Sequence, residues 1–133
     1  MHTTNYFGTL ITPSADCPVS ESTAPGKPDS VAGLQYALLA DAPYALSSDD
    51  VLFEVFARRK DIPEAEREEA RAAFFAKPQA CLRASPLVKS FGWGLHHDAD
   101  GRVALVAQDS DTYAALLGDE RVTKRPGMRS KRE

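Results

Sequence analysis

The sequence predicts an α+β fold in which a small, mainly antiparallel sheet packs against three or four helices. Two observations support this prediction. Residues 91–107 form two β-rich runs joined by a tight turn at Asp98–Gly101, which is the pattern of a β-hairpin. Several other segments combine a capping residue with a run of helix-forming residues. A chain of 133 residues is long enough for one domain with its own hydrophobic core.

The amino-terminal part is expected to contain a strand, a loop and a helix. Asn5–Ile11 mixes aromatic and aliphatic residues with threonine, which favours a strand. Residues 13–30 hold four prolines and few apolar side chains, so we expect a mobile surface loop. A helix is predicted from Val31 to about Asp41, with Ser30 as its cap. Its buried face is expected to consist of Val31, Leu34, Leu38 and Leu39.

Two interpretations compete for residues 51–59. As a helix, the segment follows a serine cap, has acidic residues in its first turn and ends in two arginines, all of which suit the helix dipole. As a strand, it would place Val51, Phe53, Val55 and Ala57 on one face. We favour the helix.

The segment from Asp61 to Ala76 has the composition of a capped helix. Asp61 or Ile62 is the expected cap, and Pro63 lies in the first turn. Glu64 is placed to reach back as a capping-box partner. Ion pairs at helical spacing are expected between Glu64 and Arg67 and between Glu68 and Arg71. The buried stripe is expected to consist of Ala70, Ala73 and Phe74, with Phe75 making a second contact.

The carboxy-terminal part is expected to hold the hairpin and two more helices. Ser85 and Pro86 start a short helical turn that runs to Ser90. The hairpin strands are expected at Phe91–His97 and Arg102–Ala107. The last helix is expected to span Thr112–Leu117, with Ser110 or Asp111 as its cap and Gly118 at its end. Residues 121–133 form a basic tail with few apolar side chains, which we expect to be loosely held.

Composition and charge exclude several functional classes. The formal net charge of −3 does not suggest a nucleic-acid binder, and the basic tail has no aromatic side chain to stack on a base, so a nucleic-acid partner is not expected. The chain shows neither an export signal nor a long apolar segment, so we expect no membrane partner and a cytoplasmic location. Cys17 and Cys81 are expected to be free thiols in that compartment.

The run from Cys81 to Leu105 gathers most of the side chains that are capable of chemistry. Arg83, Ser85 and Lys89 lie around the start of a predicted helical turn, and together they suit a small anion. The alternative is that Arg83 pairs with an acidic residue of Glu64–Glu69 while Lys89 is solvated. Cys81 is a candidate nucleophile, although the phosphatase spacing would need an arginine where the chain has Leu87. A buried cysteine that packs as a small apolar residue is the other interpretation.

The predicted strand before the turn carries Trp93, His96 and His97. Adjacent residues of a strand point to opposite faces, so the two histidines are not expected to bind one metal ion, and we predict no metal and no cofactor. His96 is a second candidate for acid or base catalysis. Gly92 and Gly94 flank Trp93, which therefore either lines a pocket or packs in the core. Asp98–Gly101 has the composition of a turn and lacks the closing glutamate of a calcium loop.

Five short segments spread over the whole chain are specific as a set: Met1–Tyr6, Ser48–Val55, Cys81–Leu87, Gly92–His96 and Met128–Arg132. Together they resemble a family of small bacterial and fungal proteins that is catalogued only as a domain of unknown function. The resemblance implies a self-contained single-domain protein. It implies no activity, cofactor or catalytic residue.

These observations lead to two functional hypotheses. The first is a protein that binds, or acts on, a small anionic or polar ligand through Arg83, Ser85, Lys89, Trp93 and His96, with Cys81 at the edge of the site. The alternative is a non-enzymatic interaction module that uses the basic tail to bind a protein partner or a second copy of itself.

Overall fold

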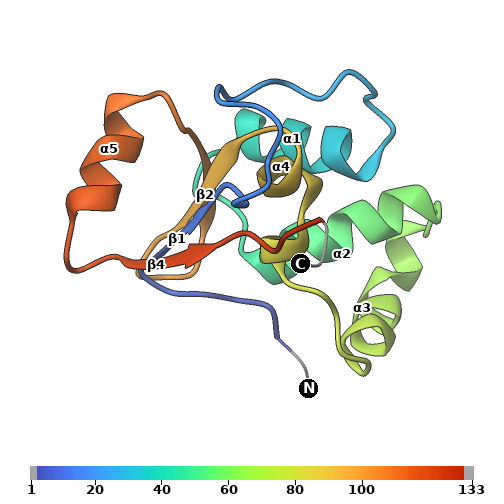
Figure 1. The fold of residues 1–133 in the computed structure, drawn as a ribbon. Helices are drawn as coiled ribbons and strands as arrows, with labels where there is room; N and C mark the ends of the chain where they lie inside the picture. Colours follow the sequence, from blue (N-terminus) through green and yellow to red (C-terminus); the bar gives the residue numbers. More distant parts are fainter. Residues whose placement is uncertain (1–2, 131–133) are drawn as a thin grey trace.

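The computed structural model describes residues 3–130 and contains, within them, a four-stranded open sheet (Figure 1). The strands are β1 (Thr9–Thr12), β2 (Trp93–His97), β3 (Val103–Ala107) and β4 (Thr123–Pro126). Their order is β3-β2-β1-β4; β4 runs parallel to β1, and the other neighbouring strands are antiparallel. The predicted α+β class and its hairpin are therefore confirmed.

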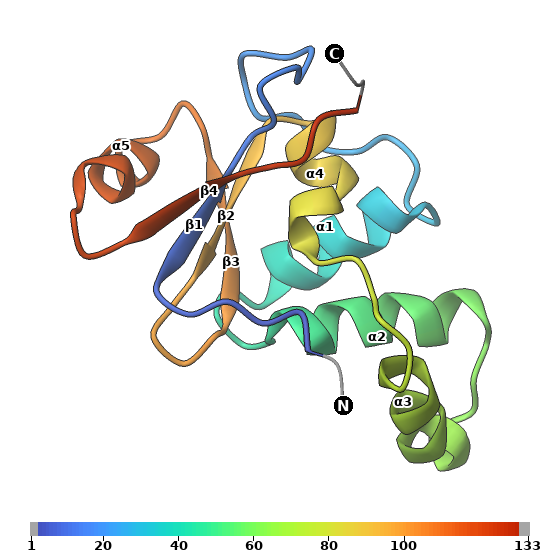
Figure 2. The same ribbon diagram turned by 60° about the horizontal axis from the view of Figure 1, so that its bottom comes forward.

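The described part of the chain holds five α-helices. They are α1 (Val31–Asp41), α2 (Ser48–Arg59), α3 (Arg67–Phe75), α4 (Pro86–Lys89) and α5 (Asp111–Gly118). Of these, α1, α4 and α5 contact the sheet, and α3 packs on α2. Single 3₁₀ turns, η1 (Glu64–Glu66) and η2 (Leu82–Ala84), precede α3 and α4. Figure 2 shows α1 and α4 on one side of the sheet and α5 on the other. None of the helices described is long and apolar enough to cross a membrane.

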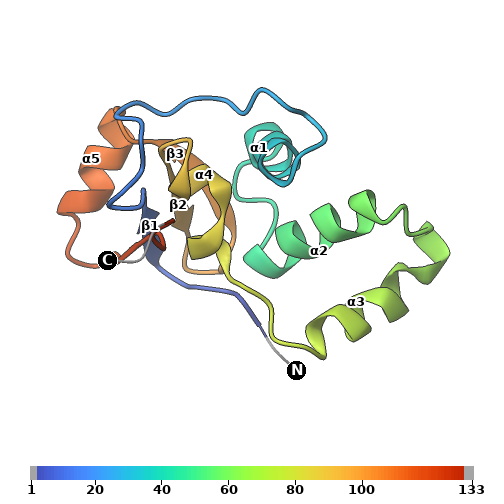
Figure 3. The same ribbon diagram turned by 45° about the vertical axis from the view of Figure 1, so that its right-hand side comes forward.

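The hydrophobic core has two parts. The larger one lies between the sheet and the helices α1, α2 and α4, and its buried members are Ile11, Ala32, Leu39, Val51, Leu82, Leu87, Val88, Leu95 and Val103. The smaller one joins α2 to α3 through Phe53, Ala57 and Phe75. Figure 3 shows α2 and α3 as a pair of helices on the side of the molecule away from α5.

Residues 51–59 belong to a helix, as favoured from the sequence. Ser47 and Asp50 form a capping box, in which the Ser47 side chain accepts from the Asp50 amide and the Asp50 carboxylate accepts from the Ser47 amide. The segment also resembles a strand because α2 is buried on two sides. Val51 packs into the larger cluster, while Phe53 and Ala57 pack against α3, so the apolar residues are not confined to one helical stripe.

The buried face of α1 differs from the predicted one. Ser30 caps the helix as expected, but the buried residues are Ala32, Gly33, Gln35 and Leu39; Val31, Leu34 and Leu38 are only partly buried. The cause is the preceding loop. A Cβ at Gly33 would collide with the backbone of Lys27 and Pro28, so the loop lies directly against this side of the helix.

The predicted helix from Asp61 to Ala76 begins later than expected. Pro63 is the residue before the 3₁₀ turn η1, no side chain caps that turn, and α3 starts only at Arg67. The expected capping box of Glu64 is therefore wrong, although Glu64 does pair with Arg67, at 3.5 Å. Arg71 pairs with Asp50 of α2 at 2.8 Å. Phe75 is the fully buried residue of α3. Of the predicted stripe, Ala70 and Phe74 are partly buried and pack against the smaller cluster, whereas Ala73 is exposed.

The expected first strand is also shorter, since β1 begins at Thr9. The residues before it bind α2 instead, and Asp49 accepts hydrogen bonds from the Thr4 amide (2.7 Å) and from the Thr3 and Thr4 hydroxyls (2.8 and 2.7 Å). Thr4 and Asp49 are both buried. The amino-terminal segment is thus fastened to the first turn of α2 before the chain enters the sheet.

Part of the basic tail is not loosely held, because it forms β4. The Thr123 amide donates a hydrogen bond to the Gly8 carbonyl (2.9 Å), and the Gly127 amide donates one to the Thr12 carbonyl (2.8 Å). The strand was not predicted because most of its residues are exposed, so it shows no alternation of apolar and polar side chains. Its backbone occupies the edge of β1, which would otherwise be unpaired.

Candidate functional site

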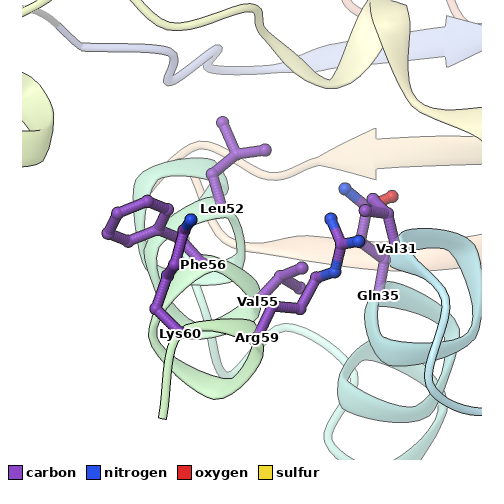
Figure 4. Close-up of a pocket in the computed structure, with 7 residues that line it drawn as sticks. All are labelled: Val31, Gln35, Leu52, Val55, Phe56, Arg59 and Lys60. Atoms are coloured by element: carbon purple, nitrogen blue, oxygen red, sulfur yellow. The ribbon is translucent and has the colours of Figure 1, made fainter. Parts of the chain in front are cut away.

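A pocket opens between α1 and α2, and its volume is about 320 Å³ (Figure 4). Helix α2 and its C-cap residue contribute side chains from one side only, spaced as i, i+3, i+4, i+7 and i+8: Leu52, Val55, Phe56, Arg59 and the cap Lys60. Helix α1 contributes Val31 and Gln35, which are one turn apart. The walls are therefore mostly apolar, with a few polar groups, as is usual for small-molecule sites.

Gln35 is the most informative residue of this pocket. Its side chain is polar, yet the residue is only 2% exposed. The Ser85 hydroxyl donates to Gln35 Oε1 at 2.5 Å, and the same hydroxyl accepts from the Leu87 amide at 3.1 Å, capping α4. Because Oε1 is occupied by Ser85, the group that Gln35 offers to a ligand is its amide Nε2, a hydrogen-bond donor.

Two cations from the end of α2 complete the lining. Arg59 and Lys60 are exposed, and among residues 3–130 neither forms an ion pair; the neighbouring Arg58 and the more distant Arg67 both pair with Glu54. Figure 4 shows the Arg59 guanidinium at the same end of the pocket as Gln35 and Val31, while Phe56 and Lys60 lie at the other end. The Gln35 amide as a donor, the Arg59 guanidinium as a cation and the apolar walls together suit an anion that carries an apolar group.

A second cavity lies between α2 and α3. Its volume is about 540 Å³, and it is lined by Phe56, Ile62, Ala70, Ala73, Phe74, Lys77 and Gln79. The rings of Phe56 and Phe74 are 4.6 Å apart in its wall. Phe56 lines both cavities, so the two meet at this side chain.

The residues predicted to bind an anion lie in different surroundings. Arg83 Nε donates to the Pro126 carbonyl at 2.7 Å and so holds the end of β4, rather than pairing with an acidic residue near α3. Ser85 is buried behind Gln35, where it positions the amide without facing solvent. Lys89 is the last residue of α4 and is partly buried. The structure therefore links only Ser85 to the pocket.

Trp93 and His96 point to opposite sides of β2. Trp93 packs against the larger core cluster, its ring lies 5.5 Å from that of Tyr36, and its Nε1 donates to the Thr23 carbonyl at 2.8 Å. His96 Nδ1 lies 2.8 Å from the hydroxyl of Tyr44. Burial lowers the pKa of His96, while the nearby Asp98 carboxylate acts in the opposite direction. The two residues cannot share one site.

His97 is fully buried, and its ring contacts that of Tyr6 edge to face at 5.5 Å. Its Nδ1 lies 3.2 Å from the Leu95 carbonyl, and its Nε2 has no hydrogen-bond partner in the described structure. Burial lowers the pKa of His97 to about 4, so the ring is neutral at pH 7. Among the residues described, no three His, Cys, Asp or Glu side chains are grouped to hold a metal ion.

Cys81 lies beside the amino-terminal segment. Its Sγ is 3.3 Å from the hydroxyl of Tyr6, and the thiol is free, like that of Cys17. Burial raises the pKa of the Tyr6 hydroxyl, Cys81 raises it further, and the Arg83 guanidinium acts in the opposite direction. The contact places a candidate nucleophile next to a hydroxyl and a cation, but away from the residues that line the α1–α2 pocket.

Neither Gln35 nor Arg59 is indicated by sequence reasoning, yet one signal was present. Gln35 is a polar residue in the middle of a segment, Val31–Leu39, that is otherwise apolar or aromatic. A polar residue in such a position is either exposed or held by a buried partner. The partner, Ser85, lies fifty positions away, so the sequence alone does not reveal it.

The fold and the pocket define a small α+β protein with a ligand-sized cavity between two helices. The chain belongs to the family of unknown function DUF6157, whose model matches residues 1–133. This match confirms the family resemblance found in the sequence. Comparison with curated proteins and with solved structures gave no match.

Proposed function

We propose that this protein binds a small anion with an apolar group in the pocket between α1 and α2. The observation that supports this most is the Gln35 side chain, which lines the pocket although the residue is 2% exposed and is held there by Ser85. Placing an amide in an apolar wall is unfavourable unless its donors are used. A ligand oxygen would use them.

The lining residues indicate the chemistry of the ligand. The Gln35 amide and the Arg59 guanidinium are both donors, so they suit a carboxylate or phosphate oxygen. Val31, Leu52 and Val55 form the apolar wall that would contact the rest of the molecule. The ligand class is the one expected from the sequence, but the residues that bind it are different.

The compartment that we propose is the cytoplasm. Cys17 and Cys81 form no disulfide. Free thiols are typical of a reducing compartment.

The proposal is tested by a titration with three ligands of one chain length: octanoate, octyl phosphate and octanol. The two anions should bind with Kd values of about 1 mM, the range typical of ligands with about ten heavy atoms, and octanol should bind more weakly because it has no charge for Arg59. Isothermal titration calorimetry measures all three.

The matched variants are Arg59→Gln and Arg58→Gln. These arginines are neighbours on α2, but only Arg59 lines the pocket. Arg59→Gln should weaken octanoate binding about tenfold, the effect of losing one charge-assisted hydrogen bond. Arg58→Gln should leave it unchanged. Equal binding of octanol and octanoate, or an equal loss in both variants, would contradict the proposal.

A further inference from the structure

The α1–α2 pocket and the α2–α3 cavity share the lining residue Phe56, so a path from one to the other would pass this side chain. Phe56 lines both, and its ring is only partly buried. The Phe56 ring packs against the rings of Phe53 and Phe74, at centroid distances of 6.3 and 4.6 Å, so joining the two cavities requires a movement of this ring.

The chemistry along this path changes from polar to apolar. Gln35 and Arg59 lie at one end of the α1–α2 pocket, and Leu52 and Val55 separate them from Phe56 (Figure 4). Beyond Phe56, the lining of the α2–α3 cavity is mainly apolar: Ile62, Ala70, Ala73 and Phe74, with Lys77 and Gln79 beside them. Gln35 and Arg59 are thus the two donors that lie together at one end. Lys60, nearer Phe56, and Lys77, in the second cavity, are exposed residues, and Gln79 Nε2 already donates to the Phe74 carbonyl. The apolar surface continues past the volume that a small anion fills.

We infer that the ligand is an alkyl-chain anion whose charged group lies between Gln35 and Arg59 and whose unbranched chain passes Phe56 into the α2–α3 cavity. This inference rests on the proposed function and adds the shape of the ligand. A branched or compact ligand would fill the α1–α2 pocket, of about 320 Å³, and leave the α2–α3 cavity, of about 540 Å³, unused. A chain uses both, and its methylene groups match the aliphatic and aromatic lining.

The inference is tested with a series of straight-chain carboxylates: hexanoate, octanoate, decanoate and dodecanoate, each below the concentration at which it forms micelles. A fully buried methylene group raises affinity about fourfold, and one that lies in an open groove raises it about twofold. Affinity for the wild-type protein should therefore rise about twofold for each added methylene group through the whole series.

The matched variants are Ala73→Trp and Ala72→Trp. Both alanines are exposed on α3, but only Ala73 lines the α2–α3 cavity. Ala73→Trp should fill the cavity, keep the affinity for hexanoate and abolish the gain with chain length. Ala72→Trp should behave like the wild-type protein, and circular dichroism verifies that both variants are folded.

The outcomes separate this inference from the proposed function. If hexanoate does not bind to the wild-type protein, the proposed function fails, and the inference fails with it. If hexanoate binds but affinity does not rise from octanoate to dodecanoate, the proposed function stands and the long chain is excluded. If the gain persists in Ala73→Trp, the chain lies elsewhere, and the assignment to the α2–α3 cavity is wrong.

Discussion

The hydrogen bond between Ser85 and Gln35 gives the most specific prediction about stability. Both residues are buried, at 3% and 2% exposure. Ser85→Ala removes one oxygen with two functions: it donates to Gln35 Oε1 at 2.5 Å, and it accepts from the Leu87 amide at 3.1 Å. The variant should therefore lose a helix cap and leave a buried carbonyl oxygen without its donor.

The expected cost follows from these two losses. Removing a serine cap lowers the free energy of unfolding by about 1 kcal/mol. Leaving the Gln35 oxygen unpaired lowers it by a further 1–3 kcal/mol, roughly. Ser85→Ala should thus reduce the free energy of unfolding by about 2–4 kcal/mol, measured by urea denaturation. Ser90→Ala, at an exposed position after the same helix, is the control and should change it by less than about 0.5 kcal/mol.

A double-mutant cycle isolates the hydrogen bond from the cap. In the double variant Ser85→Ala/Gln35→Leu both polar partners are gone, so no acceptor is left unpaired. Its loss in free energy of unfolding should be smaller than the sum of the losses in the two single variants, by about 1–2 kcal/mol. Additive effects of the two substitutions, or a loss below about 0.5 kcal/mol for Ser85→Ala alone, would refute the argument.

Three further predictions concern other parts of the fold. The pKa of His97 in the folded protein is about 4, below its ordinary value of 6.5, so the unfolded chain binds the proton at a higher pH than the folded one. The free energy of unfolding should therefore fall as the pH decreases below 6.5, by about 2 kcal/mol at pH 5. Urea denaturation at pH 7 and pH 5 measures this loss. The Thr123 and Gly127 amides donate to β1, so their hydrogen exchange, followed by NMR, should be slow. Asp49→Ala removes the acceptor of the buried Thr4 amide and should cost about 2–4 kcal/mol in urea denaturation.

Each of these predictions has a control or an outcome that contradicts it. His97→Gln should lose most of the dependence on pH between 7 and 5, and an unchanged dependence would show that another group causes it. Exchange of Thr123 and Gly127 as fast as that of an unstructured peptide would mean that β4 is not paired with β1. Asp29→Ala, at an exposed position, is the control for Asp49→Ala, and equal losses would contradict the role given to the buried carboxylate.

The sequence predicts those elements that depend on near neighbours. Ser30, Ser47, Ser85 and Ser110 each accept a hydrogen bond from an amide two or three positions further along, so the cap and the helix that it starts are local signals. The hairpin turn is equally local, because the Asp98 carboxylate accepts from the amides of Asp100 and Arg102. The helices that these serines cap and the hairpin are therefore predicted near their observed positions, whereas the helix predicted from Asp61, which has no side-chain cap, begins later.

The features that the sequence does not predict depend on distant contacts. The buried face of α1 is set by the loop against Gly33, and β4 is set by the free edge of β1. The candidate site has the same origin: the polar side chain of Gln35 stays buried because the hydroxyl of Ser85, the N-cap of α4, donates to it. Propensity and periodicity carry no information about such pairs.

The most direct test of the account is an NMR titration of the uniformly ¹⁵N-labelled protein with octanoate. We expect chemical-shift changes that saturate with octanoate concentration for the Gln35 side-chain amide, the Arg59 Nε and the backbone amide of Val31. These groups surround the proposed position of the carboxylate. Saturable shifts centred on Arg83 and His96 instead, or no saturable shift at all, would contradict the assignment of the α1–α2 pocket as the binding site.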